Sequence, residues 1–202
     1  MRRLGLILLG ALALVIGIWI AMLVFLPDAP GGQRPRASKA PAPAVAAVAE
    51  TVVEGAPLAM PVAGLPRAAV TESWGDPREN GLREHHGNDI MAPANTPVVA
   101  AAAGRVEKLW NSAAGGITAY VRSPKRNWSY YYAHLSGYAP GLHEGQVVKV
   151  GDAIGYVGDT GNAGAGNYHL HFGLTRTAPE QHWYEGRPVD PYPYLAGKPV
   201  TR

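Results

Sequence analysis

The sequence predicts a mainly β domain, an antiparallel sheet, sandwich or barrel, preceded by one N-terminal transmembrane helix. The chain has 202 residues, of which 47% are hydrophobic, enough for one globular domain with accessory segments. From Leu58 onward, short apolar runs end at Gly, Pro, Asn or Asp, and no long helical periodicity is present. Before that point, Leu4–Leu26 is an uncharged apolar stretch of 23 residues.

Residues 1–27 are expected to form a membrane anchor. A spanning helix needs ~20 apolar residues, whereas a secretory signal has an apolar region of about 7–15 before a small-residue cleavage site. The stretch ends in Leu26-Pro27-Asp28 without a clear Ala-x-Ala, which favours an uncleaved anchor over a long cleaved signal. Two arginines precede the stretch and three basic residues follow closely, so charge alone leaves the orientation open.

Residues 28–56 are rich in Pro and Ala and are expected to form an extended linker. A run such as Pro35–Pro43 cannot bury a core and tends towards extended conformations. Its expected role is that of a spacer, which would hold the domain of residues 57–202 tens of Å from a bilayer at ~3 Å per residue.

The charge and the cysteine content of the chain argue against nucleic-acid binding and against sites that need cysteine. The formal net charge is +3, but residues 57–202 carry thirteen basic against twelve acidic side chains. This near-neutral domain gives no indication of nucleic-acid binding despite a pI near 9.2. The chain has no cysteine, which excludes disulfides and cysteine-ligated metal.

The β prediction for residues 57–202 rests on closely spaced strand candidates and on the turn signals between them. Turns are expected at Ala114-Gly115-Gly116, at Ser136-Gly137 and in the glycine-rich Gly158–Gly166. The expected strands are Pro97–Ala102, Arg105–Trp110, Thr118–Arg122, Trp128–His134, Gln146–Val150, Ala153–Val157 and His169–Thr175.

Five of the seven histidines lie in three short segments with the spacing of a metal site. The segments are His85–Asp89, Tyr132–Leu135 and His169–Phe172. A catalytic Zn²⁺ usually has three protein ligands from His, Asp or Glu and keeps a fourth position open. A single His-x-His occurs by chance in many strands, and a lone His is usually structural. Three such segments in one short domain favour a metal site.

Strand parity separates His85 from its neighbour His86. Side chains alternate between the faces of a strand, so even separations share a face. His85 and Asp89 are four residues apart, and His169 and His171 are two apart. Both pairs converge if the backbone is extended, whereas His86 would diverge from Asp89. A bend at Gly87 could break this rule.

The order of these motifs resembles the M23 peptidases, the lysostaphin- and LytM-like zinc endopeptidases of bacterial cell walls. The resemblance covers most of the domain and is specific in combination, although each piece alone is weak. The matching segments are Trp74–Arg78, Arg83–Ile90, Ala92–Ala100, Gly104–Val106, Gly145–Gly155 and His169–Phe172.

This resemblance implies a LytM-type antiparallel β-sheet, a barrel-sandwich hybrid, holding one Zn²⁺ per domain. By motif position, it implies that His85, Asp89 and His171 bind the metal and that His134 and His169 form the catalytic pair. One neutral imidazole would take a proton from water and the other would donate a hydrogen bond to the developing oxyanion. The sequence leaves open which imidazole does which.

The function expected from the resemblance is hydrolysis of peptide bonds in peptidoglycan stems or cross-links. The protein would cross the inner membrane once through residues 4–26, with its catalytic domain in the periplasm, because the cell wall lies outside the membrane. Its expected partners are the peptidoglycan peptide and the membrane, without nucleic acid. A cell-wall regulatory protein is a further candidate partner. Two alternatives are a LytM-like module that activates amidases and a zinc peptidase of exported proteins.

Several residues depart from the family pattern or receive no role in it. The loop Gly158–Tyr168 precedes His169 with a sequence of its own and is expected to border the groove. It lacks the Gly-Lys-Ser/Thr ending of a phosphate-binding loop. Arg83 is expected either to bind a substrate carboxylate or to be solvated. His143 and His182 match no metal position, and most of the aromatic residues are expected to pack.

Overall fold

The structure is a computed structural model that describes residues 57–78 and 81–198. The predicted anchor and the predicted linker both lie outside these residues. Within the described part, no helix combines the length and apolar character that a membrane crossing needs.

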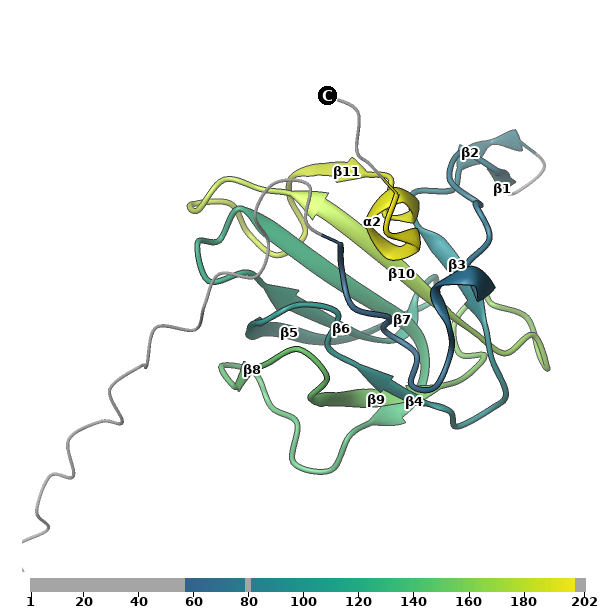
Figure 1. Ribbon diagram of the computed structural model, residues 1–202, viewed down its shortest axis with the longest axis horizontal. Helices are drawn as coiled ribbons and strands as arrows, with labels where there is room; N and C mark the ends of the chain where they lie inside the picture. Colours follow the sequence, from purple (N-terminus) through teal and green to yellow (C-terminus); the bar gives the residue numbers. More distant parts are fainter. Residues whose placement is uncertain (1–56, 79–80, 199–202) are drawn as a thin grey trace, which may run out of the picture. The chain divides into compact units, whose positions relative to one another are not determined.

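The described residues form a mainly β domain, as predicted, with one short 3-10 helix (η1) and one short α-helix. Most strands are antiparallel neighbours in a single sheet (Figure 1). The elements are η1 (Arg67–Ala69), β1 (Pro77–Arg78), β2 (Arg83–Glu84), β3 (Asn88–Met91), β4 (Pro97–Val99), β5 (Gly104–Ser112), β6 (Gly116–Arg122), β7 (Trp128–Tyr138), β8 (Val147–Val148), β9 (Ala153–Val157), β10 (His169–Arg176), β11 (Arg187–Val189) and α2 (Tyr192–Ala196).

The sheet has nine strands, and six of them follow the order β11-β10-β7-β6-β5-β8. Three strands leave this path: β3 pairs with β10, β9 pairs with β7, and β4 pairs with β9. Strands β1 and β2 form a separate two-stranded ribbon. The segment that begins with His85 therefore reaches the large sheet through β3, beside β10.

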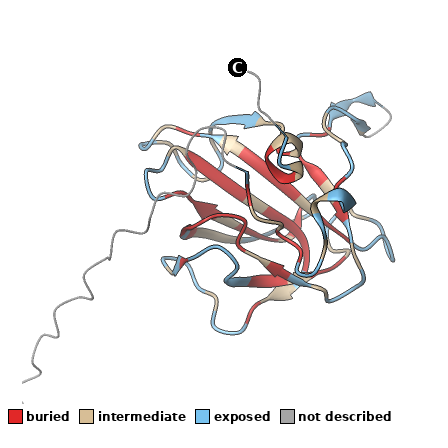
Figure 2. Ribbon diagram, viewed as in Figure 1, coloured by how far each residue is buried: buried red, intermediate tan, exposed pale blue. Residues whose placement is uncertain are grey.

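The two faces of the large sheet differ in burial, because successive side chains on a strand point to opposite faces. On β7, Tyr130 and Tyr132 are fully buried on the inner face, while Tyr131 is half-buried on the outer face. Figure 2 shows buried residues running along the central strands. The tyrosine run thus alternates between core and groove.

The predicted strands all occur, and all but one have ends that differ from those predicted. Ala153–Val157 has the predicted bounds, and β5, β6, β7 and β10 are longer than expected. Strand β4 ends at Val99, because the backbone of Ala100 bonds to the loop that precedes β9. The short strands β1, β2, β3 and β11 were not predicted, since runs of two to four residues carry no measurable periodicity.

The turn predicted at Ser136-Gly137 is wrong, because both residues lie inside β7. Here β7 changes partners and pairs with β9, with Gly137 opposite Tyr156 and a register shift just before it. The irregularity that the glycine signals is therefore a bend within a strand. The expected turn at Ala114-Gly115-Gly116 does connect β5 and β6.

Candidate metal centre

His85 lies between β2 and β3 and turns one ring nitrogen towards the outer face of the sheet. Its Nδ1 lies 2.5 Å from the carbonyl oxygen of Ser73, which can only accept a hydrogen bond. The proton of the neutral ring is therefore on Nδ1, and Nε2 carries a free lone pair. The side chain is 5% exposed, so this orientation is held by the surrounding protein.

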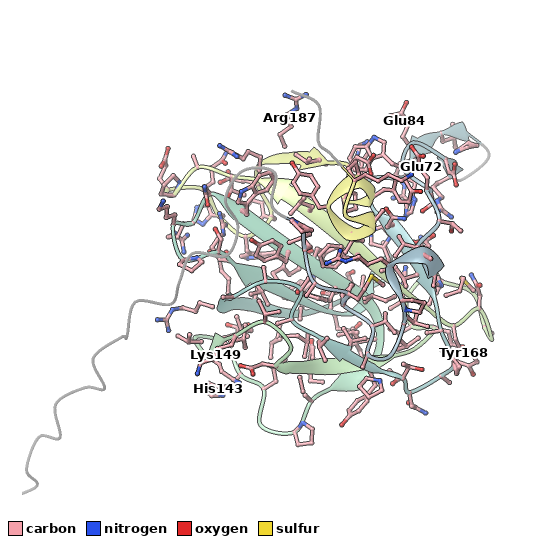
Figure 3. All side chains as sticks on the ribbon, in the orientation of Figure 1. Glu72, Glu84, His143, Lys149, Tyr168 and Arg187 are labelled. Atoms are coloured by element: carbon pink, nitrogen blue, oxygen red, sulfur yellow. The ribbon has the colours of Figure 1, made fainter. Side chains whose placement is uncertain are left out.

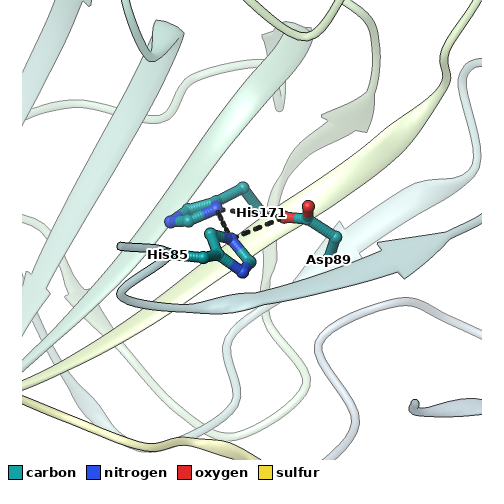
Figure 4. A group of neighbouring side chains, drawn as sticks. All are labelled: His85, Asp89 and His171. Carbon is teal, nitrogen blue, oxygen red and sulfur yellow. Dashed lines mark hydrogen bonds and ion pairs between the residues drawn. The ribbon is translucent and has the colours of Figure 1, made fainter. Parts of the chain in front are cut away.

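Asp89 and His171 come together because β3 and β10 pair antiparallel with these two residues directly opposite each other. Figure 4 shows them with His85 around one point. Asp89 Oδ1 lies 3.1 Å from both His85 Nε2 and His171 Nδ1, and the two nitrogens are 2.9 Å apart. The three atoms thus form a nearly equilateral triangle.

This triangle suits a tetrahedral metal ion. With Zn²⁺–N and Zn²⁺–O distances of about 2.0–2.1 Å, two ligand atoms of a tetrahedron lie roughly 3.3 Å apart. The observed separations are only slightly shorter. Two imidazoles and one carboxylate are also a typical donor set for catalytic zinc. The chemistry and the spacing of the three groups therefore fit Zn²⁺.

The protonation states are those that a metal site requires. Burial lowers the pKa of His171, which keeps its ring neutral near pH 7. Burial alone would raise the pKa of Asp89, but the neighbouring rings of His171 and His85 outweigh it and hold that pKa far below its usual range. The carboxylate is thus ionised and both rings can offer lone pairs.

Arg78 orients the carboxylate from the side opposite the histidines. Its Nη2 donates to Asp89 Oδ2 over 2.6 Å, which leaves Oδ1 to face the two rings. The backbone N–H of Asp89 is also held, by the hydroxyl of Ser73 at 3.1 Å. Sequence reasoning placed Arg78 in a matching motif without giving it a role. No local signal reveals its contact with Asp89, because β1 and β3 come together only in the fold.

The backbone does bend at Gly87, and the lack of a side chain at this residue lets the ring of His171 lie close to it. A Cβ atom at Gly87 would lie 2.6 Å from the ring of His171, so only glycine fits here. His85 still turns towards Asp89, as predicted. His86 lies outside the cluster, with its ring stacked on Trp74 at 5.2 Å.

His134 reaches the outer face through a β-bulge. Two residues of β7, Ala133 and His134, lie opposite the single residue Thr118 of β6, and His134 has a φ of 59°. Regular alternation would send His134 into the core, because Tyr132 and His134 are two residues apart. The bulge brings consecutive side chains to the same side, a device common beside active sites.

His134 and His169 present the same tautomer as His85. The Nδ1 atom of His134 donates to the carbonyl of Thr160 at 2.7 Å, and that of His169 donates to the carbonyl of Asn167 at 2.8 Å. Each neutral ring therefore keeps a lone pair on Nε2. Their ring centroids are 4.8 Å apart, and His169 Nε2 lies 3.8 Å from Asp89 Oδ1. Burial lowers the pKa of His134 to about 4, so its ring is neutral near pH 7.

All five predicted site residues line one groove of about 480 Å³. The expected border formed by the glycine-rich loop is present, since Asn162, Ala163 and Asn167 line this groove. Arg83 lines it as well, as does Tyr131 from the outer face of β7. The groove is therefore lined by two arginines, by residues of the glycine-rich loop and by the histidines.

The remaining histidines lie apart from this group. His143 is exposed on the loop before β8, and His182 stacks on Tyr184 with 5.4 Å between ring centroids (Figure 3 labels His143). Tyr168, also labelled in Figure 3, is 37% exposed on the loop that leads into β10. It belongs to the glycine-rich loop but is not among the residues that line the groove.

Proteins of known name have similar sequences. An L-Ala–D-Glu endopeptidase of Bacillus subtilis is 38% identical over 130 residues, which are 61% of this chain and 38% of the relative. The peptidoglycan DD-endopeptidase ShyC of Vibrio cholerae is 33% identical over 45% of this chain and 20% of its own length. The chain therefore spans well under half the length of either relative.

The fold is likewise similar to solved structures. The catalytic domain of the antimicrobial peptidase lysostaphin from Staphylococcus simulans superimposes with a TM-score of 0.51 and 26% identity, over 62% of this chain and 90% of that domain. The model of peptidase family M23 matches residues 83–191, a segment that contains all five groove histidine and aspartate residues. The chain therefore belongs to peptidase family M23, a family of metallopeptidases.

Proposed function

We propose that the protein is a membrane-anchored zinc endopeptidase that hydrolyses peptide bonds in peptidoglycan stems or cross-links. One observation carries this proposal. Three convergent ligand atoms, from His85, Asp89 and His171, lie beside two further imidazoles with unprotonated Nε2 atoms, and all of them face one open groove.

The relatives support the choice of substrate class. One is named for the L-Ala–D-Glu bond and another is named a peptidoglycan DD-endopeptidase. These names describe different bonds of the same polymer, so they favour peptidoglycan peptides without favouring one bond. This chain covers only part of each relative, and the substrate is therefore part of the proposal.

The chain's own residues would bind the substrate and move protons. When bound by His85, Asp89 and His171, Zn²⁺ supplies Lewis acidity that makes hydroxide available near neutral pH. A neutral His134 or His169 can accept a proton from water at Nε2, and the protonated ring can then donate to the leaving amide nitrogen. The other ring can donate a hydrogen bond from Nε2 to the oxyanion of the attacked carbonyl once it has taken up a proton there from solvent.

The location is proposed from residues 1–56. The apolar stretch of residues 4–26 would anchor the chain in the inner membrane, and the Pro/Ala-rich segment would let the domain reach the nearby wall in the periplasm. An N-terminus on the cytoplasmic side follows from this substrate. Labelling of the intact protein from each side of the membrane would test the orientation.

The decisive test is digestion of the natural polymer. The full-length chain, purified in detergent and loaded with Zn²⁺, is incubated with intact sacculi, and the released muropeptides are identified by mass spectrometry. We expect new peptide ends within stems or cross-links. A chelator-treated sample serves as the control, and no products should form in it.

The alternatives predict different results. A regulatory module would release no products from sacculi but would raise the rate of an added amidase. A peptidase of exported proteins would leave sacculi intact and cleave unfolded polypeptide. Intact sacculi in the presence of bound zinc would overturn the proposed function. All five site positions are filled, which favours an active enzyme over a degenerate module.

A further inference from the structure

Four aromatic rings form a continuous row that starts beside the candidate metal centre. Tyr131, Tyr120, Trp183 and Trp110 contact one another in this order, with ring centroids 4.6, 4.8 and 5.9 Å apart. We call this row the aromatic strip. Its first member, Tyr131, also lies 5.8 Å from the ring of His171.

The strip lies on the outer face of the sheet, the same face as the metal centre. Tyr120 on β6 is directly opposite Tyr131 on β7, and Lys108 on β5 is directly opposite Tyr120. Trp110 follows two residues after Lys108 on the same face. Trp183 lies in the segment between β10 and β11 and contacts both Tyr120 and Trp110. Neighbouring strands lie about 4.8 Å apart, so the part on β7, β6 and β5 spans roughly 10 Å.

The backbone of β10 makes room for the start of the strip. Gly173 lies opposite Tyr131, and a Cβ atom there would approach the tyrosine ring to 3.2 Å. The ring therefore lies close over β10 beside the metal centre. A ligand that extends out of the groove past Tyr131 would contact Tyr120 next, because the two rings touch each other.

The strip is accessible rather than part of the core. Trp110 is 47% exposed, and the other three rings are partly exposed, whereas Tyr130 and Tyr132 on the inner face are fully buried. Tyr184, next to Trp183, is 65% exposed. Contiguous exposed aromatic surface next to a groove is typical of a ligand-binding site.

The charge around the strip favours an uncharged ligand. Lys108 lies 5.8 Å from the centre of the Trp110 ring, but it is paired with Glu144 at 2.9 Å. The end of the strip thus carries no net charge from this pair. Flat aromatic faces suit the C–H faces of sugar rings, whose hydroxyl and amide edges remain in water.

We propose that the aromatic strip binds the glycan strand to which the scissile peptide is attached. This inference rests on the proposed function, because the groove must hold the peptide for the strip to meet the sugar. A peptide stem and its sugars are covalently joined, and Tyr131 belongs to both surfaces. The strip would then raise the affinity for glycan-linked peptides over free peptides of the same sequence.

The test compares two substrates that differ only in the sugar. Full-length chain in detergent is given a disaccharide-linked stem peptide and the same peptide without sugar, and kcat/KM is measured for each. We expect a preference for the linked form, and we expect Trp110→Ala and Trp183→Ala each to lower that preference about threefold to tenfold. Tyr156→Ala, on β9, is the matched control and should keep the wild-type preference.

A binding measurement separates this inference from the proposed function. A β-1,4-linked N-acetylglucosamine tetramer is titrated into the same proteins and tryptophan fluorescence is followed, which requires no turnover. Saturable binding that Trp110→Ala weakens supports the strip even if neither peptide is cleaved. Thermal unfolding shows that each variant is folded. No saturable binding, or an equal preference in wild type and both tryptophan variants, would overturn the proposal.

Discussion

The outer face of the sheet carries two polar clusters that differ in how their hydrogen-bonding atoms are used. At one end, His85, His134 and His169 each donate from Nδ1 to a backbone carbonyl and keep Nε2 without a proton. These free nitrogens face an open groove. The fixed tautomers prepare the site to bind a cation and to accept protons.

At the other end, Arg122 is 1% exposed and donates to Glu107 at 2.6 Å and to the carbonyl oxygen of Gln181 at 3.2 Å. Arg126 adds a second bond to Glu107 at 3.0 Å and one to the carbonyl of Pro179. These donors hold the segment after β10 against β5 and β6. The comparison shows that ring nitrogens with free lone pairs facing a groove indicate a reactive site. Buried charged groups whose hydrogen bonds are satisfied indicate a structural role instead.

Removing a metal ligand should have the largest effect. In His85→Ala or His171→Ala, we expect the bound metal and the hydrolytic activity to be lost together, with activity falling ~10⁴-fold or more. Metal content is measured by mass spectrometry of the protein after dialysis. Chelator-treated wild type should regain activity when Zn²⁺ is added. The neighbouring variant His86→Ala should keep both properties, and loss of metal there would contradict the assigned ligand set.

Removing either remaining groove histidine should separate metal binding from turnover. His134→Ala and His169→Ala should retain about one metal per chain while kcat falls ~10²–10⁴-fold, as expected for the loss of an acid–base group. His143→Ala, which replaces an exposed histidine that does not line the groove, serves as the control. Full turnover by His134→Ala would disprove its role.

Disrupting the cluster of Arg122, Arg126 and Glu107 should lower the stability of the fold and leave catalysis unchanged. Glu107→Ala leaves the buried Arg122 without its carboxylate partner, and we expect the free energy of unfolding to fall by about 3–5 kcal/mol. Activity per folded molecule should stay near that of wild type. Denaturant unfolding followed by tyrosine and tryptophan fluorescence measures the change.

The exposed ion pair between Lys108 and Glu144 provides the control for that experiment. Glu144→Ala should cost about 1 kcal/mol or less, because solvent weakens an exposed pair. Equal losses of stability in Glu107→Ala and Glu144→Ala would show that burial does not distinguish the two pairs.

Removing the hydrogen bond that orients Asp89 should have a smaller effect on metal binding than removing a ligand. Arg78→Met removes the donor to Asp89 Oδ2, and we expect metal affinity to fall about 10–100-fold while the ligands themselves remain. Competition with a chelator of known affinity measures this change. Arg187→Met, on the exposed strand β11 labelled in Figure 3, should keep the wild-type affinity. A matching loss in both variants would point to general charge and not to orientation of the carboxylate.

Much of the fold could be predicted because apolar runs and glycine-rich turns are local signals. The seven predicted strands occur, and Ala153–Val157 has its predicted bounds. The unpredicted strands are too short for periodicity, and the strand break expected at Ser136-Gly137 is a bend inside β7. A glycine signals irregular backbone, but whether the chain turns or bends depends on which strand pairs with it.

The sequence by itself determined the composition of the site. It separated His85 from His86 by parity and named five residues, and the fold brings all five to one groove. It also predicted the glycine-rich border before His169. Side-chain alternation and motif order are properties of the chain alone, so both could be applied without knowledge of the fold.

Tertiary structure decided the orientation of the site side chains. The direction of His134 depends on a bulge between β6 and β7, and the approach of His171 depends on the missing side chain at Gly87. The link from Arg78 to Asp89, and the aromatic strip that begins at Tyr131, both require segments that pair only in the folded sheet. Such contacts arise from strand pairing over long sequence separations, which no local pattern encodes.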